Sequence, residues 1–299
     1  MKKNYTYAVL TVFIWSTLAT IAKILLSDIP NLETLAISSL LAFLFLVIIN
    51  IRNGLIKTLK NYSLKDYFKM AGLGFLGLFL YSALYYFGLT QLSSQEACIL
   101  NYLWPIMLVI FSSIILKEKM TAIKLIAMLC SFAGIIILST GSSSISGKNV
   151  WAGIASCIIA AACYGLFSVL NKKADYDQNI AMMIIWLTTA ICSAITGLFT
   201  EKWVPIKPTQ WLGIIWLGVV IDAVAYLMWA LALKGAKNTA KIANLAYLTP
   251  FLSLIVSAIV LDEKISLRSF VALIFIVGGI IVQSFCEGFQ NKKSDKSSS

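Results

Sequence analysis

The sequence contains no histidine. This absence excludes Ser-His-Asp triads, histidine general bases and histidine metal ligands together. Charged residues are scarce, at 12% of the chain against about 25% in an ordinary soluble domain, whereas 60% of the residues are hydrophobic. The six cysteines lie in apolar runs without a close second cysteine, which favours buried thiols over disulfides or metal ligands. We therefore exclude a water-soluble globule and expect no cofactor and no metal.

Long polar stretches are missing as well. The longest are residues 51–66 and 287–299, and both are too short to bury a core of their own. The net charge of +11 is compatible with nucleic-acid binding, but a nucleic-acid domain needs a folded basic face outside the membrane, and no stretch can supply one. Any function must therefore lie within the hydrophobic part of the chain.

Hydrophobic runs are what the chain has in abundance. A membrane-spanning helix needs about 20 apolar residues, so ten such helices use roughly 200 of the 299 positions. The runs are too long for barrel strands, and unpaired backbone groups are costly in lipid, so each run is expected to be helical. The sequence predicts an all-α integral membrane protein with ten transmembrane helices, near residues 5–27, 32–51, 67–89, 96–116, 121–140, 150–171, 179–200, 210–232, 240–261 and 266–286.

The basic residues are distributed unevenly between the loops. With an even number of spans both termini lie on one side, and that side receives seventeen Lys and Arg residues against five on the other. This bias predicts a multi-pass protein of the plasma membrane with both termini in the cytoplasm. Residues 291–299 are rich in Lys and Ser and are expected to form a disordered cytoplasmic tail.

The chain contains an internal repeat. At a shift of 145 residues, the segment 100–139 aligns without a gap with 245–284 and gives 15 identities in 40 positions. We therefore divide the chain into units 1–145 and 146–290 with five spans each. Because five is odd, the second unit enters the membrane from the opposite face, an arrangement that recurs in secondary transporters with the substrate site between the units. The matched pairs include Tyr102 with Tyr247, Pro105 with Pro250, Glu118 with Glu263 and Lys119 with Lys264.

Aromatic and polar side chains recur at helical spacing inside several spans. Two explanations stay open: these side chains line a central cavity, or they join neighbouring helices by hydrogen bonds worth about 0.6–2 kcal/mol each. Their collective convergence on one interface favours the cavity. The stripes are Tyr81 and Tyr85 in the third span, Tyr164, Ser168 and Asn171 in the sixth, and Asp222, Tyr226 and Trp229 in the eighth.

Asp222 lies near the middle of the eighth span. An ionised side chain there costs at least about 2.5–3.5 kcal/mol unless it meets water or a partner. It is a candidate to bind a substrate amine, to carry a coupling proton, or to hydrogen-bond a neighbouring helix. Glu96 is a second coupling candidate, because Glu96 and Lys241 begin equivalent spans and are placed to line the two mouths of a pathway.

Two prolines fall at equivalent positions in the fourth and ninth spans. Pro105 and Pro250 each remove one helical hydrogen bond, so both helices are expected to kink there. The kinks leave the carbonyls of Asn101 and Ala246 available to other polar groups.

On these residues the sequence resembles the EamA branch of the drug/metabolite transporter superfamily, with two five-helix units, a proline in the fourth and ninth spans, and Glu118 and Glu263 closing those spans. The segment Asn101-Tyr102-Leu103-Trp104-Pro105 is similar to the aromatic amino acid exporter subfamily of the YddG type. In the second half Leu248-Thr249-Pro250 has the common family form, and Asp222 matches no family motif. The resemblance implies a basket-shaped cavity between the halves, lined by Tyr81, Tyr85, Tyr102, Trp104, Tyr164 and Tyr247.

We therefore expect a secondary transporter of small amphipathic metabolites, with aromatic or apolar amino acids as the first choice and organic cations or drugs as the alternative. An intramembrane enzyme lacks a nucleophile with its base, and a purely structural protein remains a third class. The expected partners are a small-molecule substrate and the lipid bilayer, with the chain a monomer. The candidate substrate-binding residues are Trp15, Tyr81, Tyr85, Asn101, Tyr102, Trp104, Tyr164, Asp222, Tyr226, Asn244 and Tyr247.

Overall fold

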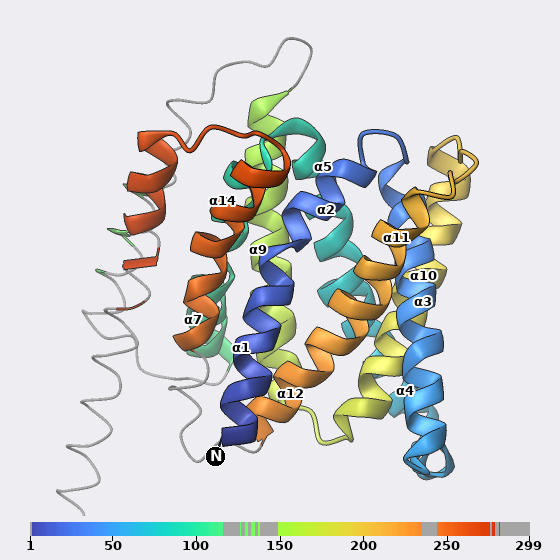
Figure 1. Ribbon diagram of the computed structural model, residues 1–299. Coiled ribbons are helices and arrows are strands. Elements are labelled where there is room, and N and C mark those ends of the chain that lie inside the picture. Colours follow the sequence, from blue (N-terminus) through green and yellow to red (C-terminus); the bar gives the residue numbers. More distant parts are fainter. Residues whose placement is uncertain are drawn as a thin grey trace, which may run out of the picture.

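The structure is a computed structural model that describes residues 2–115, 126, 129–130, 133–134, 137, 149–234, 244–275, 277–278 and 281. Within these residues every regular element is a helix and none is a strand. Figure 1 shows the helices arranged as a bundle whose long axes run mostly in one direction. The prediction of an all-helical membrane protein is confirmed, whereas the count of ten spanning helices and the inversion of the units stay predictions.

The helices of the first half follow one another through short connections. Residues 267–275, near the other end of the chain, are also helical. In chain order the first half comprises α1 (Lys2–Ser16), α2 (Leu18–Leu25), α3 (Asn31–Arg52), the 3₁₀ helix η1 (Leu55–Asn61), α4 (Leu64–Gly74), the π-helix η2 (Phe75–Leu80), α5 (Tyr81–Gln91), α6 (Ser94–Asn101) and α7 (Trp104–Ile115). The second half comprises α9 (Val150–Lys173), α10 (Gln178–Thr200), α11 (Gln210–Ile215), the π-helix η3 (Trp216–Ala225), α12 (Tyr226–Lys234), the 3₁₀ helix η4 (Asn244–Leu248) and α14 (Thr249–Val260).

Six helical stretches are long and apolar enough to cross a membrane: Tyr5–Leu25, Asn31–Arg52, Leu64–Gln91, Val150–Asn171, Gln178–Thr200 and Gln210–Trp229. They coincide with six of the ten predicted spans. The predicted fourth span is divided into α6 and α7, and α14 covers the second half of the predicted ninth span. Most of the predicted fifth span, including Glu118 and Lys119, lies outside the described residues.

Local sequence explains where several helices begin. Ser63 and Asp66 form a capping box at the start of α4, and Ser93 and Glu96 form another at the start of α6, so that each pair satisfies two backbone N–H groups. Asp177 accepts hydrogen bonds from the N–H groups at the start of α10. These caps fix the helix starts at positions that hydropathy alone leaves uncertain by several residues.

The chain is interrupted ahead of each repeated proline. α6 ends at Asn101, and α7 begins at Trp104, so Pro105 lies in the first turn of a new helix, where its missing N–H costs least. In the second half the short 3₁₀ helix η4 leads into α14, and Pro250 again lies in the first turn. The structure therefore has a break before each proline, where we predicted a kink inside a continuous helix.

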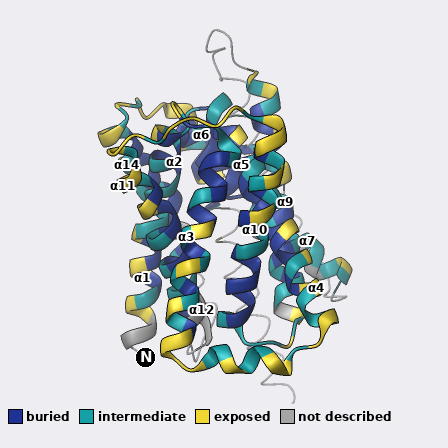
Figure 2. Ribbon diagram, turned by 90° about the vertical axis from the view of Figure 1, so that its right-hand side faces the viewer, coloured by how far each residue is buried: buried dark blue, intermediate teal, exposed yellow. Residues whose placement is uncertain are grey.

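The bundle buries a close-packed interior and exposes an apolar exterior. α3 packs along α10, α9 packs against α5 and α7, and α1 packs against α12. Figure 2 shows buried residues along the inward faces of these helices and exposed residues at the periphery. Large apolar side chains such as Phe13, Phe199 and Leu212 are exposed on outward faces, as expected of a surface that meets lipid tails.

The two ends of the bundle differ in the residues they carry. Residues 26–30, 92–93, 201–209 and 261–266 lie at the end away from the N-terminus, which we call the distal end, and residues 53–63 and 174–177 lie at the proximal end (Figure 1). At the distal end Lys207 Nζ lies 2.9 Å from Asp28 Oδ2. The hydrogen bond and the charge of Lys207 lower the pKa of the Asp28 carboxyl.

Candidate functional site

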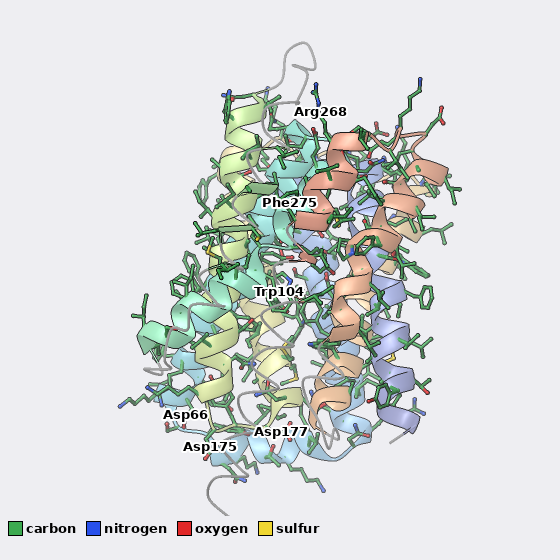
Figure 3. All side chains as sticks on the ribbon, turned by 90° about the vertical axis from the view of Figure 1, so that its left-hand side faces the viewer. Asp66, Trp104, Asp175, Asp177, Arg268 and Phe275 are labelled. Carbon is green, nitrogen blue, oxygen red and sulfur yellow. The ribbon has the colours of Figure 1, made fainter. Side chains whose placement is uncertain are left out.

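A cavity lies inside the bundle, with an interior volume of about 40 Å³. Figure 3 places Trp104, one of its lining residues, about midway between Arg268 near the distal end and Asp66, Asp175 and Asp177 at the proximal end. The cavity therefore lies near the middle of the bundle's length. It is lined by Trp15, Leu18, Ala19, Tyr81, Tyr85, Cys98, Asn101, Tyr102, Trp104, Tyr164 and Tyr226.

Breaks in regular helix present several of these residues to the cavity. Asn101 ends α6, Tyr102 lies in the turn that follows, and Trp104 begins α7. Tyr81 is the first residue of α5, directly after the π-helix η2, and Tyr226 is the first residue of α12, directly after the π-helix η3. Short π-helical turns occur frequently at functional sites, because the inserted residue changes the direction of the side chains that follow.

The tyrosines of the first group form a continuous aromatic surface. The rings of Tyr81 and Tyr85 are stacked, with centroids 6.1 Å apart and planes inclined by 6°. Tyr164 lies against both Tyr81, at 5.0 Å, and Trp104, at 5.2 Å with the ring planes perpendicular. Such stacked and edge-to-face pairs contribute about 0.5–1.5 kcal/mol each beyond the burial of area.

A second aromatic group is centred on Tyr226. Its ring lies 5.3 Å from Trp15 and 5.7 Å from Trp186, and Trp15 lies 5.2 Å from Trp229. The side chains of Tyr164 and Tyr226 share a hydrogen bond, which joins the two groups. The aromatic surface thus extends from α5 and α7 through α9 to α1 and α12.

The cavity also carries polar groups that the protein leaves unpaired. Asn101 Nδ2 donates a hydrogen bond to the Tyr81 hydroxyl at 3.1 Å, whereas Asn101 Oδ1 is buried with no hydrogen-bond partner in the described part of the chain. Trp15 Nε1 is likewise buried and unpaired there. A buried polar atom without a partner costs about 1–3 kcal/mol, so a ligand that pairs with these atoms recovers that free energy.

Asp222 lies in η3, one helical turn before Tyr226, and only 5% of it is exposed. Its carboxyl group has the Ser38 side chain as a hydrogen-bonding neighbour, and its Oδ2 has no partner in the described residues. Tyr81, Tyr86 and Tyr226 lie close enough to interact with it electrostatically. Asp222 therefore lies beside the cavity without lining it, in a place where an ionised carboxylate lacks a compensating cation within the described residues.

The structure brings together eight of the eleven predicted substrate-binding residues. The exceptions are Asp222 and two residues of η4, Asn244 and Tyr247, whose side chains fall outside the described part of the structure. Glu96 lies at the distal end, in the capping box of α6, and Lys241 lies outside the described residues. In the part of the chain that the structure describes, no three Cys, Asp or Glu side chains come together to hold a metal ion.

Several residues at the site are absent from the sequence-based set. Leu18, Ala19 and Cys98 line the cavity, and Trp186 extends the second aromatic group. A usable signal was present for the symmetry of the site, because Tyr81 and Tyr226 are separated by the same 145 residues as the repeat. The small lining residues carry no such signal, since an apolar residue in an apolar span is unremarkable.

Comparison with known proteins gives this geometry a family context. An uncharacterized transporter from Clostridium kluyveri is 24% identical over 296 residues, covering 94% of this chain and 93% of the relative. An uncharacterized transporter from Archaeoglobus fulgidus is 28% identical over 294 residues, covering 94% and 98%. The aromatic amino acid exporter YddG from Ancylobacter novellus is 25% identical over 212 residues, covering 70% and 73%.

A solved crystal structure has the same fold, with a TM-score of 0.69 and 21% identity, and the match covers 96% of this chain and 98% of that one. The model of the EamA-like transporter family matches twice, at residues 2–140 and 151–285. These two matched segments include nearly the whole chain and contribute residues to opposite sides of the aromatic cavity. The chain therefore belongs to the EamA-like transporter family.

Proposed function

We propose that this protein is a secondary transporter that exports aromatic or apolar amino acids across the plasma membrane by alternating access. Transporter activity follows from the family and from relatives named as transporters. The choice of substrate rests on the chemistry of the cavity, with the name of the YddG relative as weaker support.

The observation that carries the proposal is an aromatic cavity with unpaired polar atoms between the two matched segments. Trp15, Tyr81 and Tyr102 come from the first segment, and Tyr164 and Tyr226 come from the second. Stacked rings match the side chain of an aromatic amino acid. Asn101 Oδ1 is an acceptor for an ammonium group, and Trp15 Nε1 is a donor for a carboxylate.

The size of the cavity indicates that binding requires movement. A volume of about 40 Å³ holds only about three water molecules, since each needs at least about 10–15 Å³. An amino acid with an aromatic side chain is much larger than this. The rings of the two segments must therefore separate to admit a substrate, which is the motion that alternating access between two repeats provides.

The direct test is exchange in reconstituted vesicles. Vesicles containing the purified protein are preloaded with unlabelled Trp, Phe or Tyr, and the entry of labelled Trp is followed. We expect counterflow above that of protein-free liposomes, and competition by Phe and Tyr in excess of that by Asp or Lys. Counterflow equal to that of empty liposomes for all three amino acids would reject the substrate assignment.

Organic cations are a second candidate substrate class because of Asp222. Its unpaired carboxyl oxygen lies next to an aromatic surface, and a cation is attracted both by a carboxylate and by the faces of Tyr and Trp rings. The same vesicles separate the two classes. If quaternary ammonium compounds displace labelled Trp poorly but are themselves exchanged, the protein is a cation exporter.

Proton coupling is a further part of the proposal, and Asp222 is the residue proposed to carry the proton. A buried carboxyl group without a cation partner in the described residues can bind and release a proton as its surroundings open to water. We expect labelled-substrate flux to respond to an imposed pH gradient, and Asp222→Asn to remove that response. Flux that is indifferent to both would reject proton coupling through Asp222.

A further inference from the structure

Glu263 joins the start of α6 to the chain that follows α14. Its Oε1 accepts a hydrogen bond from the Ser94 N–H at 2.9 Å, and its Oε2 accepts one from the Ser94 hydroxyl at 3.0 Å and one from the Gln95 N–H at 3.3 Å. The Gln95 side-chain amide also donates to the Glu263 carbonyl at 3.1 Å. We call these contacts the Glu263 clamp, and they connect residues of the two matched segments at the distal end.

The residue before the clamp has an unusual backbone. Asp262 has a φ of +54°, and among the described residues it is the one non-glycine residue with positive φ. This left-handed conformation costs an L-residue roughly 1–2 kcal/mol, so neighbouring contacts must hold it in place. The Glu263 clamp supplies those contacts, which means that the turn is strained in the clamped state and relaxes when the clamp opens.

α6 connects the clamp directly to the cavity. It begins at Ser94 under Glu263 and presents Cys98 and Asn101 to the cavity less than two turns later. Between the clamp and the cavity the interior is close-packed, and the layer consists of fully buried apolar residues. They are Ala22, Leu89, Leu92, Ala97 and Leu100.

A second carboxylate at the distal end serves as a comparison. Glu201 Oε2 accepts hydrogen bonds from the N–H groups of Leu32, at 3.0 Å, and Glu33, at 3.3 Å, and so ties the end of α10 to the start of α3. This helix pair is also tied at the proximal end, where Asn50 Nδ2 donates to the Asn179 carbonyl at 3.2 Å. α3 and α10 are thus joined at both ends, as expected of a fixed scaffold.

From this contrast we infer that the Glu263 clamp is the gate that closes the distal end of the cavity, whereas Glu201 only stabilises the scaffold. Opening the clamp frees the start of α6 from the end of α14 and separates the apolar layer above the cavity. The inference rests on the proposed alternating access, and it assigns to Glu263 a positioning role distant from the substrate itself.

The native thiol of Cys98 provides a reporter. It lines the cavity beneath the clamp, and 5% of the residue is exposed. The full-length protein with Cys98 as its single thiol is labelled with a membrane-impermeant maleimide added to the distal side of the vesicles. In the parent protein labelling is slow, and in Glu263→Gln we expect it to be about tenfold faster, since charge-assisted hydrogen bonds are lost. The five cysteines replaced by Ala are Cys130, Cys157, Cys163, Cys192 and Cys286.

The matched control is Glu201→Gln, which removes the same charge from an equivalent cap at the same end. Its labelling rate is expected to stay within about twofold of the parent rate, a difference well below that of a lost charged hydrogen bond. The inference is wrong if Glu263→Gln does not accelerate labelling, or if both variants accelerate it equally, because equal effects mean general loosening. Labelling needs no substrate, so a failure of amino acid exchange would reject the substrate assignment and leave the gate testable.

A locking experiment covers the case in which Glu263→Gln does not fold. Ser94→Cys and Glu263→Cys are combined in a background without native cysteines and joined by a short, reducible thiol cross-linker. We expect cross-linking to stop the exchange of whichever amino acid or cation the vesicles transport, and reduction to restore it. Exchange that continues at its full rate in the cross-linked protein would overturn the assignment.

Discussion

At the scale of single residues, Tyr164 holds a central position in the cavity. Its ring contacts both Tyr81 and Trp104, and its hydroxyl is joined to that of Tyr226. It is therefore the one tyrosine through which the two aromatic groups meet in the described residues. The ring and the hydroxyl of Tyr164 can be tested separately, because Phe keeps the first and removes the second.

We predict that Tyr164→Ala raises the half-saturation concentration for Trp in counterflow by roughly tenfold, since two aromatic pairs worth about 0.5–1.5 kcal/mol each are lost. Tyr164→Phe keeps both ring contacts and is expected to stay within about threefold of the parent. Concentration dependence of initial counterflow rates measures both. Equal effects of the two variants would show that the hydroxyl, and not the ring, determines binding.

Asp222 offers a second test, of charge at constant shape. Asp222→Asn keeps the size of the side chain and its contact with Ser38, but it removes the possibility of ionisation. We predict a loss of substrate flux of about tenfold or more, with a thermal unfolding midpoint that is unchanged or higher, because a neutral amide is easier to bury than a carboxylate. Normal flux combined with a lower midpoint would instead make Asp222 a structural residue.

At the scale of helices, close approach is possible only where glycine lies at the contact. Gly218 in η3 faces α3, and a Cβ atom added there would lie 2.4 Å from the Ser38 carbonyl oxygen and 2.9 Å from Leu41 Cβ. Because the nearest obstacle is backbone, it cannot turn aside as a flexible side chain would. α3 and η3 must therefore move apart to accept even one methyl group, and this contact also fixes Asp222 beside Ser38.

We predict that Gly218→Ala lowers the unfolding midpoint of the detergent-solubilised protein by roughly 2–10 °C, from an overpacking cost of about 1–3 kcal/mol. Gly72→Ala in α4 is the control, because nothing lies within 4 Å of a Cβ added there. That variant is expected to leave the midpoint unchanged or to raise it slightly, since Ala is favoured over Gly in helices by about 0.5–1 kcal/mol. A smaller loss in Gly218→Ala than in Gly72→Ala would contradict the packing.

Hydropathy and helical spacing predicted the elements of this fold better than their interruptions. Spacing placed Tyr81, Tyr85, Tyr164 and Tyr226 on inward faces, because a polar hydroxyl within a long apolar run has few other places to go. It could not predict the π-helices, since one extra residue in a turn leaves the hydropathy of the run unchanged. The caps supplied by Glu201 and Glu263 were missed for a different reason, because each joins residues more than 160 positions apart.

At the scale of the whole molecule, the ends of the bundle must lie on opposite sides of the membrane. Lys60 is near the proximal end, which carries many basic residues, and Thr209 is near the distal end. The proximal end is the one that the charge bias assigns to the cytoplasm. The proposed direction of export depends on this orientation.

We predict that Thr209→Cys, in a background without native cysteines, is modified in intact cells by a membrane-impermeant maleimide. Lys60→Cys should react only after the cells are permeabilised, because its side of the membrane is then exposed to the reagent. Gel mobility after treatment with a large maleimide reads out both. Modification of both positions in intact cells would contradict the spanning arrangement, and the reverse pattern would invert the orientation.

The two π-helices, η2 and η3, have a consequence for how the chain tolerates insertions and deletions. Each contains a surplus residue, so removing one amino acid from 75–80 would return that stretch to ordinary α-helical register and rotate everything after it by about 100°. Tyr81 would then turn away from Asn101 and Tyr164 while the segment kept its length and hydropathy. Shortening by a single codon could thus abolish ligand recognition without harming membrane insertion.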